Sequence, residues 1–141
     1  MIVRFIVSSL AGGIVLFLLG FLIYGLFLEA WMRTQIADLP GMMKEEPDMI
    51  ALAVFNLVLA GMIAFVAENW AKARNFVDGL KVGGVLIFFY SMSVNLSFTA
   101  FMNVITSISA PIVDVFAMTF MGTIAGGVIG IVLGKMRGSE S

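Results

Sequence analysis

The sequence predicts an all-α, polytopic membrane protein in which four transmembrane helices form one bundle. Of its 141 residues, 61% are hydrophobic and only 12% are charged, which exceeds the apolar share of ordinary soluble domains. Apolar runs recur four times, each long enough to cross a hydrocarbon core about 30 Å thick, which takes roughly 20 helical residues. In lipid every backbone polar group needs a partner within its own segment, so these runs are helices. We expect a single membrane domain over residues 1–141, with the lipid bilayer as its first partner.

The four predicted spans cover residues 5–28, 49–67, 82–106 and 112–133. The first is a retained helix, because its apolar run is long and lacks a small-residue cleavage site. Residues 29–48 form an outer loop, part of which is expected to lie flat on the membrane. Between the last two spans only "SISAP" remains, so they are antiparallel neighbours with Pro111 in a first helical turn. Asp48 and Asp78 are the expected caps of the second and third spans.

Lysine and arginine are distributed unevenly about these spans. The side that holds both termini and the connection between the second and third spans carries six of them, against Arg33 and Lys44 on the other side. The positive-inside rule then predicts one fixed orientation in the cell inner membrane, with the amino and carboxyl termini cytoplasmic. The six residues are Arg4, Lys72, Arg74, Lys81, Lys135 and Arg137.

Composition argues against several classes of function. The chain has no cysteine and no histidine, so it lacks disulfides and the commonest general base and metal ligand. A net charge of −1 argues against nucleic acid as a partner, since that binding needs many basic contacts to phosphate. Eleven methionines suggest copper(I) as a ligand, because soft thioethers select this ion. Methionine also fills apolar cores, which is the alternative explanation. We predict no metal site, no cofactor and no catalytic residues.

Glycine forms the most specific pattern, with overlapping GxxxG units in the fourth span. Such a row lets a neighbouring helix approach to backbone contact, which is a main source of association where lipid offers no hydrophobic drive. Gly83 begins a corresponding row in the third span. The predicted packing residues are Gly83, Gly122, Gly126, Gly130 and Gly134.

A polar row continues along the third span through Ser91, Asn95, Thr99 and Asn103, each four residues apart. Residues four apart share one side of a helix, so these hydroxyls and amides form a seam. Counting along the helices places Asn56 at a depth similar to that of Asn95, and we expect the two amides to meet. Two interpretations stay open: the seam joins helices by hydrogen bonds, or it lines a path for a small solute or ion.

Acidic residues give weaker signals. Asp114 lies in a predicted span, where a carboxylate is by default a functional hypothesis. Its place in the first turn, where the helix dipole favours negative charge, offers a structural alternative. Glu29, Glu68 and Arg33 lie at the ends of spans and are expected to be interfacial anchors.

The chain resembles a family of small bacterial four-helix inner-membrane proteins catalogued only as a domain of unknown function. The resemblance rests on "GFLIYGLFLEAWM" at residues 20–32, on "NLSFTAFMN" in the third span and on "GTIAGGVIG" in the fourth. It covers most of the chain. It implies the four-span topology and no particular activity.

These observations favour a non-enzymatic scaffold or accessory subunit that associates through its glycine and polar seams. Its partners would then be further copies of the chain or a larger membrane complex. The alternative is a carrier or channel that passes a small solute or ion along Asn56, Ser91, Asn95, Thr99, Asn103 and Asp114. A membrane-embedded enzyme is less favoured, because no residue pattern supplies an acid and base pair.

Overall fold

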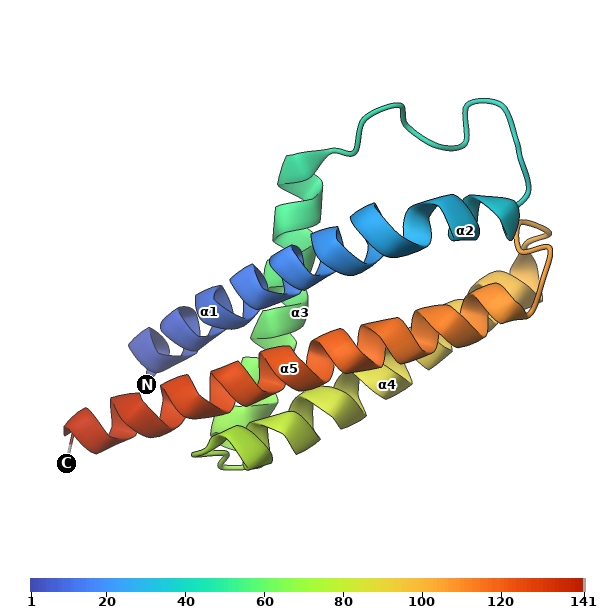
Figure 1. The fold of residues 1–141 in the computed structure, drawn as a ribbon. Coiled ribbons are helices and arrows are strands. Elements are labelled where there is room, and N and C mark those ends of the chain that lie inside the picture. The colour runs from blue at the N-terminus through green and yellow to red at the C-terminus, as the bar shows by residue number, and fades with distance from the viewer. Residues whose placement is uncertain (141) are drawn as a thin grey trace.

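The computed structural model describes residues 1–140, which are helical from Ile2 onward apart from the connections 35–48, 70–75 and 102–108 (Figure 1). Four helical segments are long and apolar enough to cross a membrane, as predicted for a multi-pass membrane protein. Within the described residues there is no β-strand, only an isolated bridge between Ile36 and Ile105. The elements are α1 (Ile2–Gly20), η1 (Phe21–Leu28), α2 (Glu29–Thr34), α3 (Met49–Asn69), α4 (Phe76–Phe101) and α5 (Ser109–Glu140).

The first segment is longer than predicted, because α1, η1 and α2 form one continuous helix over Ile2–Thr34. Residues 29–34, which we expected in the outer loop, extend this helix along its own direction instead of folding flat (Figure 1). The middle section, Phe21–Leu28, is a π-helix. Such wide turns are rare inside α-helices and occur frequently at functional sites.

The third segment lies closer to the amino terminus than predicted. Helix α4 begins at Phe76 and ends at Phe101, so Asn103 lies in the turn that follows the helix and not on its seam. Asn75 caps α4 through its side chain, which accepts a bond from the Asp78 amide, so the prediction that Asp78 is the cap was wrong. At α3 the prediction is confirmed, since the Asp48 carboxylate accepts from the Ala51 amide at 3.0 Å.

Two helix pairs make up the bundle. Helices α4 and α5 form an antiparallel hairpin with the most extensive contact in the molecule, and α1 packs against both α3 and α5. Helix α3 crosses the others steeply, so that its first turns lie away from the bundle (Figure 1). Both termini and the connection 70–75 lie at one end, here called the terminal end. The connections 35–48 and 102–108 lie toward the other, here called the loop end.

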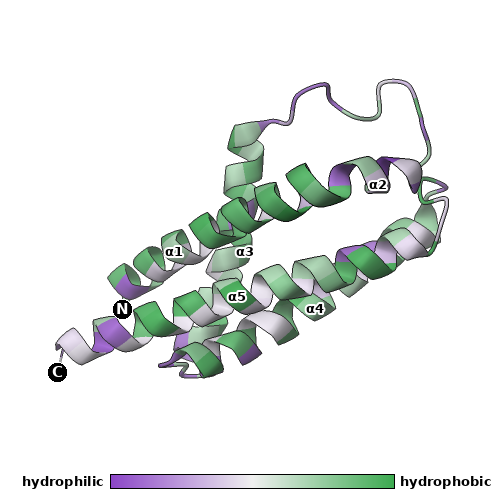
Figure 2. Cartoon of the chain, viewed as in Figure 1, coloured by the Kyte–Doolittle hydropathy of each residue, from purple (hydrophilic) through white to green (hydrophobic). Residues whose placement is uncertain are grey.

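The buried core lies in the half of the bundle nearer the terminal end. Small residues on α3 allow this close packing, since Ala60, Ala64 and Ala67 are fully buried. The first turns of α3, from Met49 to Phe55, are exposed. Apolar residues run along the helices while hydrophilic ones gather at the two ends (Figure 2). The core comprises Leu16, Leu59, Ala60, Ile63, Ala64, Ala67, Ala73, Ile87, Met121, Ala125, Ile129 and Leu133.

Glycines on both helices of the α4–α5 hairpin face each other. A Cβ added at Gly126 would overlap the carbonyl oxygen of Gly79, and one at Gly83 would overlap that of Gly122. Added side-chain atoms at Gly130 and Gly134 would overlap the carbonyls of Asn75 and Arg74. The two backbones therefore touch, and no larger residue fits at these positions without separating the helices.

Candidate functional site

Three polar side chains from three segments of the bundle meet nearer the loop end. The Tyr24 hydroxyl, on the π-helical section η1, donates to Oδ1 of Asp114 on α5 at 2.6 Å. The Asn95 amide, on α4, donates to Oδ2 of the same carboxylate at 2.7 Å. Each oxygen of Asp114 thus accepts a bond from a neutral donor. We call Tyr24, Asn95 and Asp114 the carboxylate network.

A cavity of about 430 Å³ borders this network. Asn95 and Asp114 are among its lining residues, and Asp114 is the one charged side chain in that lining. The walls come from the end of the first segment, from the loop 35–48 and from the connection between α4 and α5. Backbone bonds hold these parts together: the Ala37 amide donates to the Val104 carbonyl, and the Thr106 amide to the Gln35 carbonyl.

The predicted polar seam divides into a buried and an exposed part. Ser91 is buried and donates to the Phe88 carbonyl of its own helix. Asn95 is half-buried and joins the carboxylate network. Thr99 and Asn103 are exposed, and Thr99 donates to the Asn95 carbonyl. The structure therefore brings Asn95 and Asp114 together, while Thr99 and Asn103 lie apart from that network.

Asn56 lies elsewhere than expected. It is buried on α3, but its amide donates to the Leu52 carbonyl of the same helix at 2.9 Å. The amide of Asn95 is directed at Asp114 instead. The predicted Asn56–Asn95 pair is not formed, because α3 crosses the bundle and has little contact with α4.

A second charged cluster lies at the terminal end and centres on Glu68. The side chain is 2% exposed, and Arg4, Arg74 and Arg137 all contact its carboxylate, at 3.0, 3.4 and 3.2 Å. Arg4 also pairs with Glu140. The arginines come from α1, from the connection before α4 and from α5. Glu68, which we predicted to be an interfacial anchor, lies at the end of α3, and its carboxylate also joins three parts of the chain.

The Glu68 cluster holds more positive than negative charge. Burial and the neighbouring Arg137 guanidinium lower the pKa of Arg74, against the attraction of Glu68. Two of its guanidinium nitrogens, Nη2 of Arg74 and Nε of Arg137, are buried without a hydrogen-bond partner in the described residues. The three guanidinium groups on one buried carboxylate are typical of a structural ion cluster.

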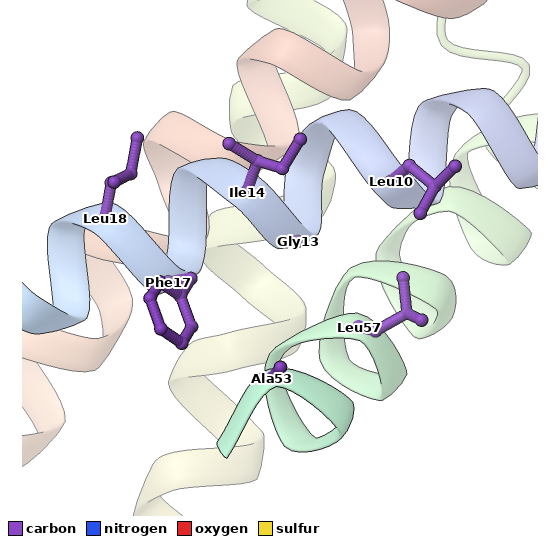
Figure 3. Close-up of a pocket in the computed structure, with 7 residues that line it drawn as sticks. All are labelled: Leu10, Gly13, Ile14, Phe17, Leu18, Ala53 and Leu57. Atoms are coloured by element: carbon purple, nitrogen blue, oxygen red, sulfur yellow. The ribbon is translucent and has the colours of Figure 1, made fainter. Parts of the chain in front are cut away.

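Other hollows offer little chemistry. The groove between α1 and α3, about 330 Å³ in volume, is lined by apolar side chains and Gly13 (Figure 3). A recess of about 270 Å³ is lined by the seam residues Asn95 and Thr99, but otherwise by apolar side chains such as Phe88 and Phe116. Among residues 1–140 no group of histidine, cysteine, aspartate or glutamate side chains could hold a metal ion. The cavity beside the carboxylate network is therefore the best candidate site.

Sequence reasoning missed Tyr24 and the arginine partners of Glu68. Tyr24 interrupts an apolar run, and a buried tyrosine hydroxyl usually has a partner, so it could have been matched with Asp114 as the acid available in a span. In the sequence, the three arginines that contact Glu68 give information only about the orientation of the chain in the membrane. Their convergence on Glu68 joins residues 64 and 69 positions apart in the sequence, which no local pattern reveals.

No family model, curated protein or solved structure matches this chain. Function therefore has to be argued from the residues of the molecule.

Proposed function

We propose that the protein is a non-enzymatic membrane scaffold or accessory subunit that associates with a second copy of itself through the exposed face of α4. The observation that carries this proposal is a mismatch between polarity and burial. The most apolar stretch of α4 has a mean hydropathy of 1.5, against 2.0 to 2.5 for the other three spans. Only 11% of that stretch is buried in the chain, against 28% to 44% elsewhere.

Polar groups facing hydrocarbon are costly, so the least apolar span is expected to be covered. The exposed face of α4 carries Ser93 and Ser97, a small-xxx-small pair that permits close helix approach. A recess of about 300 Å³ lies over this pair, bordered by Phe98, Phe101 and Met102. The Ser97 hydroxyl makes no hydrogen bond within residues 1–140, which leaves it for a partner helix.

A second copy fits this face better than lipid does. Phe89 and Phe101 stand at either end of Ser93 and Ser97 along it, at steps of four residues. In a pair of copies with the same orientation, related by a twofold axis, the serines of the two chains would face each other. The face also carries no charged side chain between Phe89 and Met102, so like charges do not oppose pairing. The glycines of α4 and α5 then make contacts within one chain, whereas Ser93 and Ser97 make contacts between chains.

Disulfide trapping tests the proposal in the naturally cysteine-free chain. Ser97→Cys in native membranes should give a crosslinked dimer on mild oxidation, while the matched control Val58→Cys, on an exposed face of α3, should not. Ser93→Leu added to Ser97→Cys should abolish the crosslink. Equal trapping at both positions, or a monomer by mass measurement in lipid nanodiscs, would overturn the proposal.

A small-solute or ion carrier is the second candidate, favoured by the cavity that borders Asn95 and Asp114. An intramembrane carboxylate held by neutral donors is typical of ion paths. Asn95→Ala should then abolish flux in reconstituted vesicles while the fold stays intact. Unchanged flux in the variant would remove this candidate.

The proposed function also requires a defined orientation of the chain in the membrane. We infer that the chain lies in the inner membrane with both termini cytoplasmic, on the six-to-two lysine and arginine bias. A reporter that is active only in the cytoplasm, fused after residue 141, should be active, and the same reporter inserted in the loop 35–48 should not. The reverse pattern would contradict the inference.

A further inference from the structure

Methionines gather at the cavity beside the carboxylate network. Four of the eleven methionines line this one cavity, together with Asn95 and Asp114. They come from three parts of the chain, namely α2, the loop 35–48 and the connection after α4. The four are Met32, Met42, Met43 and Met102.

These side chains do not fill the core, which was the expected role of methionine. Met42, Met43 and Met102 are 37%, 70% and 50% exposed, and none of the four belongs to the buried cluster or packs against it. Met121, Met118 and Met62 take that role instead. An apolar gap therefore does not explain the methionines at the cavity.

The backbone holds the methionine-bearing segments together. The bridge between Ile36 and Ile105, with the bonds from Ala37 to Val104 and from Thr106 to Gln35, joins the loop to the α4–α5 connection. Met32 precedes Ile36 and Met102 precedes Ile105 in the sequence, and Met42 and Met43 follow Ile36 after the Pro40-Gly41 turn. Gly41 adopts a positive φ of 77°, which glycine allows at little cost.

From this geometry we propose that the cavity is a binding site for a soft monovalent cation, copper(I), with the four methionine sulfurs as its ligands. Thioethers are soft and uncharged, so they select copper(I) and not hard divalent ions. Asp114 supplies a single negative charge beside the site, and its oxygens are already bonded to Tyr24 and Asn95. One carboxylate balances one monovalent charge, whereas a divalent ion would keep an unbalanced charge.

The loop next to the site also favours cations. Asp38 and Arg33 both line an adjoining cavity that shares Met42 and Met43. The rest of the loop has three acidic residues, Glu45, Glu46 and Asp48, against one basic residue, Lys44, so its net charge is negative. Acidic groups at the mouth of a site raise the local concentration of cations. The inference does not rest on self-association, although Met102 borders both this cavity and the recess over Ser93 and Ser97. It names an ion class for the carrier candidate.

Silver(I) binding to the purified full-length protein tests the proposal, since silver(I) is a redox-inert analogue of copper(I). The cavity variant replaces Met32, Met42, Met43 and Met102 with leucine, a volume-conserving change. The matched control replaces four methionines outside the cavity, Met49, Met62, Met118 and Met136. The control should bind one silver(I) as the natural chain does, and the cavity variant should lose that binding.

Methyl signals of methionine give a second readout that needs no variant. In the natural chain labelled at the methionine methyl carbon, silver(I) should shift four of the eleven signals and leave the rest in place. Asp114→Asn should weaken binding roughly tenfold, as loss of a supporting group around a metal typically does. Ser97→Leu should leave binding unchanged, so failure of self-association and failure of this site are distinguishable.

Three outcomes would overturn the proposal. Equal silver(I) binding by the cavity variant and the control would mean that silver(I) binds methionines all over the protein and not at one site. Shifts in all eleven methyl signals would lead to the same conclusion. Tighter binding of zinc(II) than of silver(I) would mean that the site is not thioether-based.

Discussion

Glu68 and Asp114 are carboxylates near opposite ends of one bundle, and they differ in what surrounds them. Three arginines contact Glu68, so its charge is more than compensated. Asp114 accepts only from a phenol and an amide, so its charge remains. A carboxylate in an ion cluster has no capacity left for a ligand, whereas one held by neutral donors beside a cavity can attract a cation.

The packing around Glu68 is also closer than the packing around Asp114. Near Glu68 the helices touch along glycine and alanine, and the buried core lies in this half. Near Asp114 α3 leaves the bundle and cavities open beside α4. The closely packed half near Glu68 stabilises the fold, whereas the more open half near Asp114 leaves room for a ligand. Stability and ligand binding are therefore expected to depend on different halves of the bundle.

The largest effect is expected from Gly126→Leu, which tests the close-packed half. The new side chain would overlap the backbone of Gly79 and Gly83, so the unfolding free energy should fall by more than about 4 kcal/mol. Thermal unfolding in detergent measures this change. Gly138→Leu is the control on the same helix, because a Cβ at Gly138 meets no atom within 4 Å. An equal loss of unfolding free energy in both variants would show that close helix packing does not stabilise the half of the bundle near Glu68.

Glu68→Gln should be the next most damaging change. The substitution keeps the shape but leaves Arg4, Arg74 and Arg137 around a neutral group, which should cost about 3 kcal/mol, as loss of one partner of a buried ion pair does. Glu140→Gln is the control, since that side chain is 54% exposed and exposed pairs contribute about 1 kcal/mol or less. A Glu68 variant as stable as the natural chain would show that the cluster is not structural.

Asp114→Asn is expected to lower the unfolding free energy by about 2 kcal/mol, since it disturbs hydrogen bonds from two neutral donors to one carboxylate. The Tyr24 hydroxyl can still donate to the new amide oxygen, while the Asn95 amide meets another amide nitrogen. Chemical denaturation measures the loss. A cost equal to that of Glu68→Gln would mean that both carboxylates are structural and would remove the distinction between the halves.

The smallest effect concerns Asn56 and Asn95. Because Asn56 bonds to its own helix and Asn95 to Asp114, the two substitutions to alanine should add, with a coupling energy within about 0.5 kcal/mol. A double-mutant cycle of unfolding free energies measures it. Coupling above about 1 kcal/mol would indicate that the two amides interact after all.

Composition and run length alone determined that the chain has four long apolar helices, because a hydrocarbon core requires both. Local chemistry also determined the Asp48 cap. Spacing indicated the faces of α4 and α5 that carry glycine and small polar residues. It could not say that Asn103 falls outside the polar seam, because the helix stops at Phe101.

Only the tertiary structure decided which polar groups meet. The partners of Asp114 lie on η1 and α4, and those of Glu68 on α1, α5 and the connection before α4, at separations in sequence that carry no periodic signal. The steep crossing of α3 separated Asn56 from Asn95, and the bridge between Ile36 and Ile105 brought distant methionines to one cavity. A helix repeat fixes which face a residue occupies, but the crossing angles and contacts of whole helices fix what that face meets.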